Sequence, residues 1–392
     1  MVIGVPKESF PGERRVALVP AVVPNLAKAG FEVLIEMQAG LSAGYPDADY
    51  IVKGAKIAAE RREVFGRADV IVQILCHGSN DQTGAADLPL LKRGQVLVGF
   101  LRPLGVLATV EEVAATGVTA FSIELMPRTT RAQSMDALSS MATVAGYKAV
   151  VLAAETLPRL FPMLTTAAGT VTPARVFVIG AGVAGLQAIA TARRLGAVAS
   201  AYDLRPAVKE QVHSVGGRFI ELPIAAQDAQ DSRGYAKAQD EAFYQRQKEL
   251  LGNVVAESDV VITAAVVPGK KSPVLVTREM IGKMAPGSVI VDLAAERGGN
   301  CEATRPGEVV VEQNVTVIGT INLASSVPYH ASQLYARNVT AFLVHLFRDG
   351  QLHLDASDEI TRETLVTQGG EIVNTRVREF FHLPARVMQG QT

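Results

Sequence analysis

Short runs of apolar residues, rich in Val and Ile, alternate along the chain with longer stretches in which apolar and polar residues follow helical spacing. Such alternation is typical of parallel β-strands joined by crossover helices. The pattern predicts an α/β fold with two doubly wound, Rossmann-like domains and parallel sheets. The strands predicted for the first sheet cover residues 2–5, 31–35, 69–74, 95–100 and 118–123. Those predicted for the second sheet cover residues 175–179, 198–202, 218–221, 259–263, 288–292 and 316–319.

Two long helices are predicted, one between the two sets of strands and one after them. The first covers about residues 135–160, and its small side chains suit close packing between two domains separated by a cleft. The second covers about residues 332–347, with apolar residues at helical spacing. Residues 223–250 interrupt the alternation of strands and helices, because they are highly charged and poor in apolar residues. Such an insertion is typical of a lid, a binding loop or a solvated helix with a flexible lead-in.

Composition narrows the classes of function. Lys and Arg number 38 and Asp and Glu 39, so no broad positive charge exists to attract nucleic acid or anionic lipid. The N-terminus begins as a strand rather than a signal peptide, and no stretch reaches the ~18 uncharged apolar residues of a membrane span. We therefore expect a cytoplasmic protein without a direct membrane span. Cys76 and Cys301 lie far apart, which predicts reduced thiols and no metal site.

The strongest local motif begins where the first strand of the second set ends. Gly180, Gly182 and Gly185 follow the GxGxxG spacing and lead into a helical stretch. Such glycines allow a tight turn, close approach of the backbone to a pyrophosphate, and close packing of helix on strand. Asp203 ends the next strand, near the expected spacing of about 20 residues, and would bind ribose hydroxyls and repel a 2′-phosphate. This predicts NAD(H) rather than NADP(H), although Arg205 could accommodate such a phosphate.

A second polar cluster lies at residues 126–140, MPRTTRAQSMDALSS, which contain Arg, Gln, Asp and Ser but no His or Lys. A dehydrogenase of a small substrate needs a proton donor or acceptor beside the hydride site. Direct hydride transfer between two nicotinamides needs only placement of the rings and exclusion of water. The segment fits direct transfer. It also fits a polar helix start that is capped by Ser134 or Asp136.

Several segments together resemble one family. They are GERRVALVP at 12–20, RAQSMDALSS at 131–140, YDLRPAVKEQV at 202–212, GYAK at 234–237, PGK at 268–270 and VDLAAERGGNCE at 291–302. The chain resembles, over essentially its whole length, the NAD(H)-binding component (domain I, the first portion of the alpha subunit) of proton-translocating NAD(P) transhydrogenases. Segments 131–136 and 234–237 are specific to that family. Segment 12–20 and the glycine motif are shared with the related alanine dehydrogenases.

The resemblance implies direct hydride transfer between NAD(H) on this chain and NADP(H) on a partner subunit, coupled to proton movement. Arg128, Gln133, Asp136 and Ser139 would act in catalysis, and Gln133 would reach toward the partner's nucleotide. The residues expected to contact NAD(H) are Arg128, Arg131, Gln133, Asp136, Ser139, Gly180, Ala181, Gly182, Val183, Gly185, Asp203, Leu204, Arg205, Gly234, Tyr235, Gln247 and Val266. Residues 223–250 would form a mobile loop that closes over the nucleotide.

The same resemblance implies partners and domain boundaries. An NADP(H)-binding beta subunit (domain III) and a membrane-spanning domain II component would complete the enzyme, so the chain would be active only with its partner. It would be a cytoplasmic homodimer, peripheral to the membrane through those subunits. Residues 1–134 and 327–392 would form one domain, and residues 135–326 the NAD(H)-binding domain. Two departures from the family are Gln239, where Met is common, and Leu204, where Val is frequent.

Two alternatives stay open. An alanine dehydrogenase would share Arg15 as a carboxylate ligand. It would also need a Lys and a His where Leu75 and Arg102 stand here. Neither residue can relay a proton at neutral pH. His77 lies near the first of these places and could substitute for the Lys, or it could be a surface-loop histidine. The second alternative is a module that binds NAD(H) without turnover.

Overall fold

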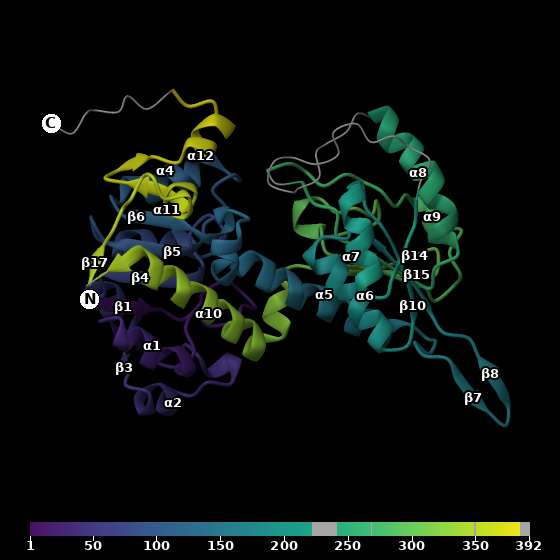
Figure 1. Cartoon of the computed structure of the whole chain (residues 1–392), viewed down its shortest axis with the longest axis horizontal. Helices are drawn as coiled ribbons and strands as arrows, with labels where there is room; N and C mark the ends of the chain where they lie inside the picture. The colour runs from purple at the N-terminus through teal and green to yellow at the C-terminus, as the bar shows by residue number, and fades with distance from the viewer. Residues whose placement is uncertain (222–240, 268, 349, 385–392) are drawn as a thin grey trace. The chain divides into compact units, whose positions relative to one another are not determined.

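The computed structural model describes residues 1–221, 241–267, 269–348 and 350–384. Contacts divide the chain into two compact units, residues 1–141 with 325–392 and residues 142–324 (Figure 1). The sequence placed these boundaries after residues 134 and 326. The structure places both a few residues away, the first of them inside helix α5 (Ala137–Thr156).

The first unit is built on an eight-stranded sheet. Its strands are β1 (Val2–Val5), β2 (Glu32–Glu36), β3 (Lys56–Ala58), β4 (Val70–Leu75), β5 (Val96–Phe100), β6 (Thr119–Ser122), β18 (Leu365–Gln368) and β19 (Glu371–Ile372). They lie in the order β19-β18-β6-β5-β4-β1-β2-β3, and the strands from β6 to β3 run parallel. Strands β4 and β5 are buried along nearly their whole length, as expected where helices cover both faces of a sheet.

The helices of this unit are α1 (Val23–Lys28), α2 (Asp47–Val52), α3 (Arg61–Arg67), α4 (Leu107–Ala115), α10 (Pro328–Leu346), α11 (Glu359–Thr364) and α12 (Thr375–Phe380). Helix α10 packs on the sheet through aromatic contacts. The rings of Tyr335 and Phe100 lie 5.6 Å apart, and those of Phe342 and Phe121 lie 5.7 Å apart. The Tyr335 hydroxyl also donates to the Gln73 carbonyl at 2.6 Å. The C-terminal segment therefore completes the core of the first unit.

The second unit contains a seven-stranded sheet in the order β11-β10-β9-β12-β13-β15-β14. Its strands are β9 (Arg175–Ile179), β10 (Val198–Tyr202), β11 (Arg218–Phe219), β12 (Val260–Thr263), β13 (Val289–Asp292), β14 (Val309–Glu312) and β15 (Val315–Gly319). Its further helices are α6 (Val183–Arg194), α7 (Lys209–Ser214), α8 (Glu241–Ala256) and α9 (Arg278–Ile281). The strand order reverses between β9 and β12, which is where doubly wound sheets bind ligands.

Short 3₁₀ helices and a two-stranded β-ribbon in the first unit connect these elements. The 3₁₀ helices are Pro20–Val22, Leu41–Ala43, Gly84–Leu90, Ile123–Leu125, Thr130–Met135, Pro206–Val208, Ala295–Arg297 and Leu323–Ser326. The ribbon is formed by β16 (Phe347–Arg348) and β17 (Gln351–Leu352). Only the 3₁₀ helix at Thr130–Met135 carries residues predicted for the site.

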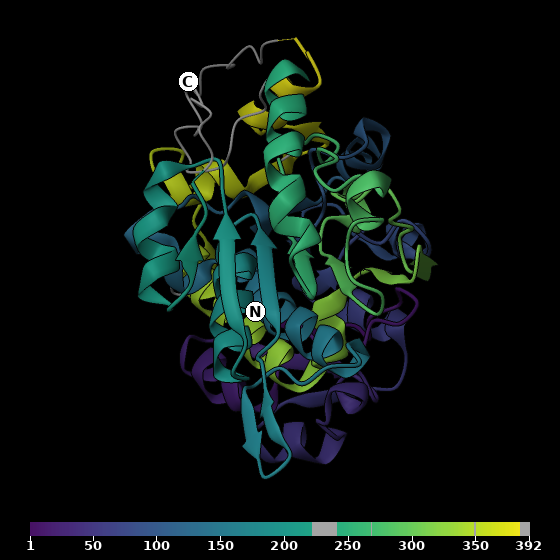
Figure 2. The same ribbon diagram turned by 90° about the vertical axis from the view of Figure 1, so that its right-hand side faces the viewer.

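The edges of the sheets differ from the prediction. The predicted α/β fold with two mostly parallel sheets is confirmed; at the sheet edges, β14 and β18 pair antiparallel with β15 and β6. Gln313 and Asn314 both have positive φ (50° and 64°), which is the geometry of a tight hairpin turn between β14 and β15. The prediction also missed β3 and a hairpin of β7 (Leu164–Thr166) and β8 (Gly169–Val171). Figure 2 shows this hairpin extending away from the second sheet.

Helix α5 is long and apolar enough to cross a membrane by length and composition alone. Ala149, Val150 and Ala153 nevertheless lie in the hydrophobic core of the second unit. Gly146 packs so closely on α6 that a Cβ there would lie 2.1 Å from the Ala184 carbonyl oxygen. These contacts are those of a core helix.

Candidate nucleotide site

The glycine motif forms a tight turn between strand β9 and helix α6. Gly180 has φ of +97°, and a Cβ on it would lie 2.8 Å from the backbone of Ala264 and Ala265 on the neighbouring loop. A Cβ on Gly185 would lie 2.0 Å from the Gly180 carbonyl oxygen. Each of these two positions therefore requires glycine for the protein's own packing.

Gly182 is different, because nothing among the described residues requires a glycine there. It is the N-cap of α6, with φ −73° and ψ −166°, a conformation open to any L-residue. A Cβ on Gly182 would meet only the Arg205 Nη2 atom, at 3.9 Å. The space over Gly182 is therefore kept clear at the N-terminus of a helix, where free N–H groups and the helix dipole attract phosphate. Val183 begins the helix, and the buried Ala181 lies between the two glycines.

Asp203 follows β10 and lies beside this turn. Its carboxylate accepts a hydrogen bond from the Ala181 N–H (2.8 Å) and one from the Arg205 N–H (2.9 Å). The Arg205 side chain adds two more, from Nε (2.9 Å) and Nη2 (2.8 Å). The hydrogen bonds with Asp203 raise the pKa of Arg205. Because a carboxylate has about four acceptor positions, Arg205 occupies those that ribose hydroxyls would use. Leu204, between the two, is half-buried.

Two further predicted contacts lie near Asp203 and Gly180. Gln247 of α8 is 1% exposed and its Nε2 donates to the Tyr202 hydroxyl at 3.0 Å. Burial raises the pKa of Tyr202 to about 12. The Gln247 Oε1 atom is buried without a hydrogen-bond partner among the described residues, so it could accept a hydrogen bond from a bound ligand. Val266 is half-buried on the loop after β12. The clear space at Gly182 and this unused acceptor fit a bound dinucleotide.

The predicted mobile loop needs a correction. Residues 241–250 belong to helix α8 rather than to a loop. Gln247, Leu251 and Val255 recur at a spacing of four and are all buried, so this charged stretch presents one face to the core. Gly234 and Tyr235 lie outside the described residues.

The polar segment of the first unit leads into α5. Asp136 directly precedes the helix, and its carboxylate accepts hydrogen bonds from the Ser139 N–H (2.8 Å) and the Ser139 hydroxyl (2.6 Å). This is the geometry of a helix N-cap, so the capping interpretation of the sequence holds at Asp136. The bond pattern also holds the two side chains together as one polar pair, both half-buried.

The other members of the segment have different surroundings. Arg128 is exposed, and so is Gln133 on the 3₁₀ helix Thr130–Met135. Arg131 forms an ion pair with Asp358, which also accepts from His345 Nε2 (2.8 Å). Burial acts to raise the pKa of Asp358, but hydrogen bonds, including those from His345 and Arg131, hold it well below its usual range. The Arg131 guanidinium is therefore engaged within the first unit.

The ends of β4 and β5 are the places where an alanine dehydrogenase would need its proton-relaying residues. Leu75 ends β4, and Arg102 follows β5 with φ of +48°. His77 is not on an exposed surface loop: its side chain is 10% exposed, and its Nε2 lies 2.6 Å from Glu112 Oε2 on α4. That element of the sequence interpretation is wrong, because the histidine turns inward against a neighbouring helix.

A buried ionic cluster lies beside the end of β4. The guanidinium of Arg15 donates two hydrogen bonds to the Glu13 carboxylate, from Nε (2.8 Å) and from Nη2 (2.5 Å). Glu8 accepts hydrogen bonds from the backbone N–H groups of Ile74 (2.6 Å) and Leu75 (3.2 Å). Burial, helped by the charge of Glu13, raises the pKa of Glu8 to about 8. The Nε and Nη2 edge of the Arg15 guanidinium is thus already paired with the Glu13 carboxylate.

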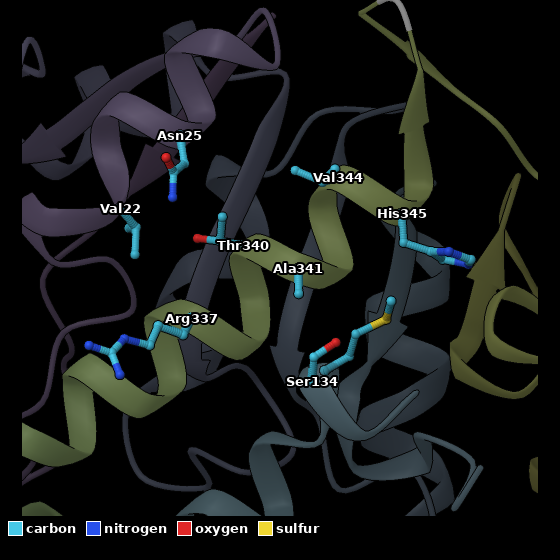
Figure 3. A pocket seen from close by; sticks show the side chains of 9 residues that line it. Val22, Asn25, Ser134, Arg337, Thr340, Ala341, Val344 and His345 are labelled. Carbon is cyan, nitrogen blue, oxygen red and sulfur yellow. The ribbon is translucent and has the colours of Figure 1, made fainter. Parts of the chain in front are cut away.

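The first unit also contains an open hollow of about 570 Å³ (Figure 3). It is lined by Val22, Asn25, Ser134, Met135, Arg337, Thr340, Ala341, Val344 and His345. Figure 3 shows that α10 supplies most of these side chains. Of the predicted NAD(H) contacts that the structure describes, none lines this hollow. The predicted contacts at residues 180–182 and Asp203 gather instead at the glycine turn of the second unit. No group of three or more potential metal ligands occurs within the described ranges.

The sequence reasoning missed two buried polar residues that organise the loop after β12. Asp292 ends β13, and Asn300 follows it in a segment whose sequence indicated only the family resemblance. The available signal was an acid at the end of a buried strand followed by Gly298 and Gly299. Sequence spacing did not indicate which backbone these side chains reach.

A strand–glycine turn–helix unit with an acid after the next strand defines a dinucleotide-binding α/β protein. Family models agree: "Alanine dehydrogenase/PNT, N-terminal domain" matches residues 4–145 and "Alanine dehydrogenase/PNT, C-terminal domain" matches residues 149–375. The chain belongs to this alanine dehydrogenase/PNT family.

Within the family, the chain is more similar to transhydrogenases than to alanine dehydrogenases. A protein of Rhodospirillum rubrum, named as the first portion of NAD(P) transhydrogenase subunit alpha, is 46% identical over 377 residues, covering 95% of this chain and 98% of that protein. The crystal structure of transhydrogenase from Sinorhizobium meliloti matches with a TM-score of 0.82 at 41% identity, covering 96% of this chain and 100% of that one. Alanine dehydrogenase of Mycolicibacterium smegmatis is 28% identical, covering 98% of each chain. The predicted resemblance to transhydrogenases, with alanine dehydrogenases as relatives, is confirmed.

Proposed function

We propose that this chain is the NAD(H)-binding subunit of a proton-translocating NAD(P) transhydrogenase. Hydride would pass directly between NAD(H) on this chain and NADP(H) on a partner subunit. Whole-chain similarity to proteins named as transhydrogenase alpha subunits supports the proposal. The observation that carries it is the clear space over Gly182 at the N-terminus of α6, beside the Asp203 carboxylate.

The residues around this turn suit binding rather than proton transfer. The loops that follow β9, β10 and β12, at residues 180–182, 203–205 and 264–267, contain no His or Lys. NAD(H), when bound, would supply the hydride donor or acceptor. The α6 N-terminus would hold the pyrophosphate, and Asp203 would hold the adenosine ribose once Arg205 moves aside. The Gln247 carbonyl oxygen, which has no partner among the described residues, would accept from the nucleotide, and Val266 would contact it from the loop after β12.

The polar segment of the first unit would act on the nicotinamide end. Arg128, Asp136 and Ser139 would grip that end, and the exposed Gln133 would reach toward the partner's nucleotide. Catalysis of direct transfer consists of placing two rings and excluding water, which polar side chains achieve without exchanging protons.

The proposal includes partners for the two other functions. An NADP(H)-binding beta subunit (domain III) would bring the second nucleotide, and a membrane-spanning domain II component would couple transfer to proton movement. The chain would then work at the cytoplasmic face of the membrane, held there by these subunits.

A second copy of the chain would cover the β7–β8 hairpin. All six strand residues of the hairpin are exposed. Among them Leu164 (46%) and Val171 (45%), together with the adjacent Met163 (64%), leave apolar surface open. A two-stranded hairpin alone is marginally stable in water and its edges invite pairing, so a covering surface is expected. Met163→Glu should dissociate the dimer in analytical ultracentrifugation. A monomeric wild-type chain would reject the dimer.

An assay with a partner tests the proposed reaction. The purified chain is mixed with an NADP(H)-binding transhydrogenase component, and hydride transfer from NADPH to an NAD analogue is followed by absorbance. Transfer that requires both proteins supports the proposal. NADH production from L-alanine and NAD by the chain alone would instead support an alanine dehydrogenase, against which Leu75, Arg102 and the Glu13–Arg15 pair already count. Binding of NADH without transfer would identify a binding module.

A further inference from the structure

The loop after β12 is fixed by a single buried side chain. Asn300 is fully buried, and its Oδ1 accepts a hydrogen bond from the Ala265 N–H at 3.0 Å. Its Nδ2 donates to the carbonyl oxygens of Ala265 (2.9 Å) and Pro273 (2.8 Å). Strand β12 ends at Thr263, so Ala265 has left the sheet ladder. Buried backbone groups need partners, and one amide side chain supplies both partners of Ala265.

Asn300 is itself held from both sides. The fully buried Asp292 carboxylate accepts from the Asn300 N–H at 2.8 Å, and the Asn300 carbonyl accepts from the Leu275 N–H (2.8 Å) and the Val276 N–H (2.9 Å). Asp292 also accepts from the hydroxyl of Thr304 at 2.6 Å. The position of the Asn300 amide is therefore over-determined by its neighbours.

The held loop lies against the nucleotide turn. The backbone of Ala264 and Ala265 is the surface that a Cβ on Gly180 would strike, at 2.8 Å. Strand β12 lies on the opposite side of β9 from β10, whose end carries Asp203. A dinucleotide spans this reversal of strand order, with its adenosine half on the side of the ribose-binding acid. In the proposed binding mode, the loop at residues 264–267 would face the nicotinamide half.

We infer that Asn300 is a positioning residue for the nicotinamide half of NAD(H), an inference that rests on the proposed function. Asn300 binds both backbone groups of Ala265 and thereby fixes the position of the loop at residues 264–267, which includes Val266. Hydride transfer depends steeply on placement, since a shift of about 1 Å can cost about 100-fold in rate. Loss of the amide should therefore affect transfer and nicotinamide binding while sparing the adenosine half.

The Asn300→Asp variant tests this, because it keeps the shape but removes both donated hydrogen bonds. Thr304→Val is the matched control: it deletes one hydrogen bond to Asp292 and leaves the three bonds of the Asn300 side chain. Calorimetry gives the Kd of ADP-ribose and of NADH, denaturation gives stability, and stopped flow with the NADP(H)-binding component gives the transfer rate.

For Asn300→Asp we expect an ADP-ribose Kd within about twofold of wild type, a clearly weaker NADH Kd, and transfer slowed at least about tenfold. Thr304→Val should leave both Kd values and the rate near wild type. If Asn300→Asp weakened the binding of ADP-ribose and NADH equally, or if Thr304→Val lost as much binding and transfer, the inference about Asn300 would be overturned. The proposed function would still stand. A wild-type chain that binds no NADH would overturn the proposed function as well. If Asn300→Asp does not fold, the neutral Asn300→Ser variant, which also lacks the amide, is read by the same criteria.

Discussion

Gly182→Ala separates nucleotide binding from folding at the glycine turn. The backbone at Gly182 is extended, and the new methyl group would meet only Arg205 Nη2 at 3.9 Å, an ordinary van der Waals distance. Losing a glycine stabilises a chain by about 0.4–1 kcal/mol where the backbone is compatible. Alanine at an N-cap costs a similar amount relative to glycine. We therefore expect the free energy of unfolding to change by less than about 1 kcal/mol.

Binding should respond very differently. The methyl group would occupy the space that a pyrophosphate needs in order to approach the N–H groups of α6. Loss of one hydrogen bond to a charged group costs about 1.5–3 kcal/mol. At about 1.4 kcal/mol for each factor of ten, the Kd for NADH should rise about 10- to 100-fold. NADH fluorescence titration measures it directly, and the chain contains no Trp to interfere.

Two further glycines serve as controls. Gly185→Ala would place a methyl carbon 2.0 Å from the Gly180 carbonyl oxygen, so both folding of the second unit and NADH binding should be lost. Gly252→Ala lies within α8, where the nearest atom, Met280 Cγ, is 3.9 Å away; stability should rise slightly and the NADH Kd should stay unchanged. Wild-type NADH affinity in Gly182→Ala would refute the assignment of the phosphate to this turn.

Three other predictions follow from the site. Asp136→Asn keeps the cap on α5, so it should preserve stability but slow hydride transfer. Asp136→Ala should also lower the free energy of unfolding, measured by thermal denaturation, by about 1 kcal/mol. Unchanged transfer in both variants would remove Asp136 from the site. Arg205→Ala frees acceptors on Asp203, so calorimetry should show NADH bound severalfold tighter and NADPH weaker; equal weakening of both would contradict this. Folding raises the pKa of Glu8 from 4.5 to about 8, so the folded chain binds more protons than the unfolded chain between these values. The contribution of Glu8 to stability is therefore full below about pH 4.5 and is lost as the pH rises to about 8. Glu8→Gln should flatten this decline in urea unfolding midpoints, and an unchanged slope would assign it to other groups.

Much of the fold followed from local pattern. Strands β9 and β10 were predicted at the residues where the structure has them, because buried parallel strands are continuous apolar runs bounded by glycine and polar residues. The turn at Gly180 and the acid at Asp203 were equally visible, since the motif reflects short-range geometry between one strand and the next helix. Edge features such as β3 and the β7–β8 hairpin were missed, because short exposed strands leave no apolar run.

The sequence by itself determined the fold class, the glycine turn and the family, because these depend on residue type and spacing along the chain. Only the tertiary structure decided which partners the polar side chains have. Asp203 accepts a hydrogen bond from the Ala181 N–H, 22 positions earlier, and Asn300 holds the backbone of a residue 35 positions earlier in the chain. His77 turns inward to Glu112. Hydrogen bonds between distant segments depend on how strands are ordered and loops are folded, which no local spacing encodes.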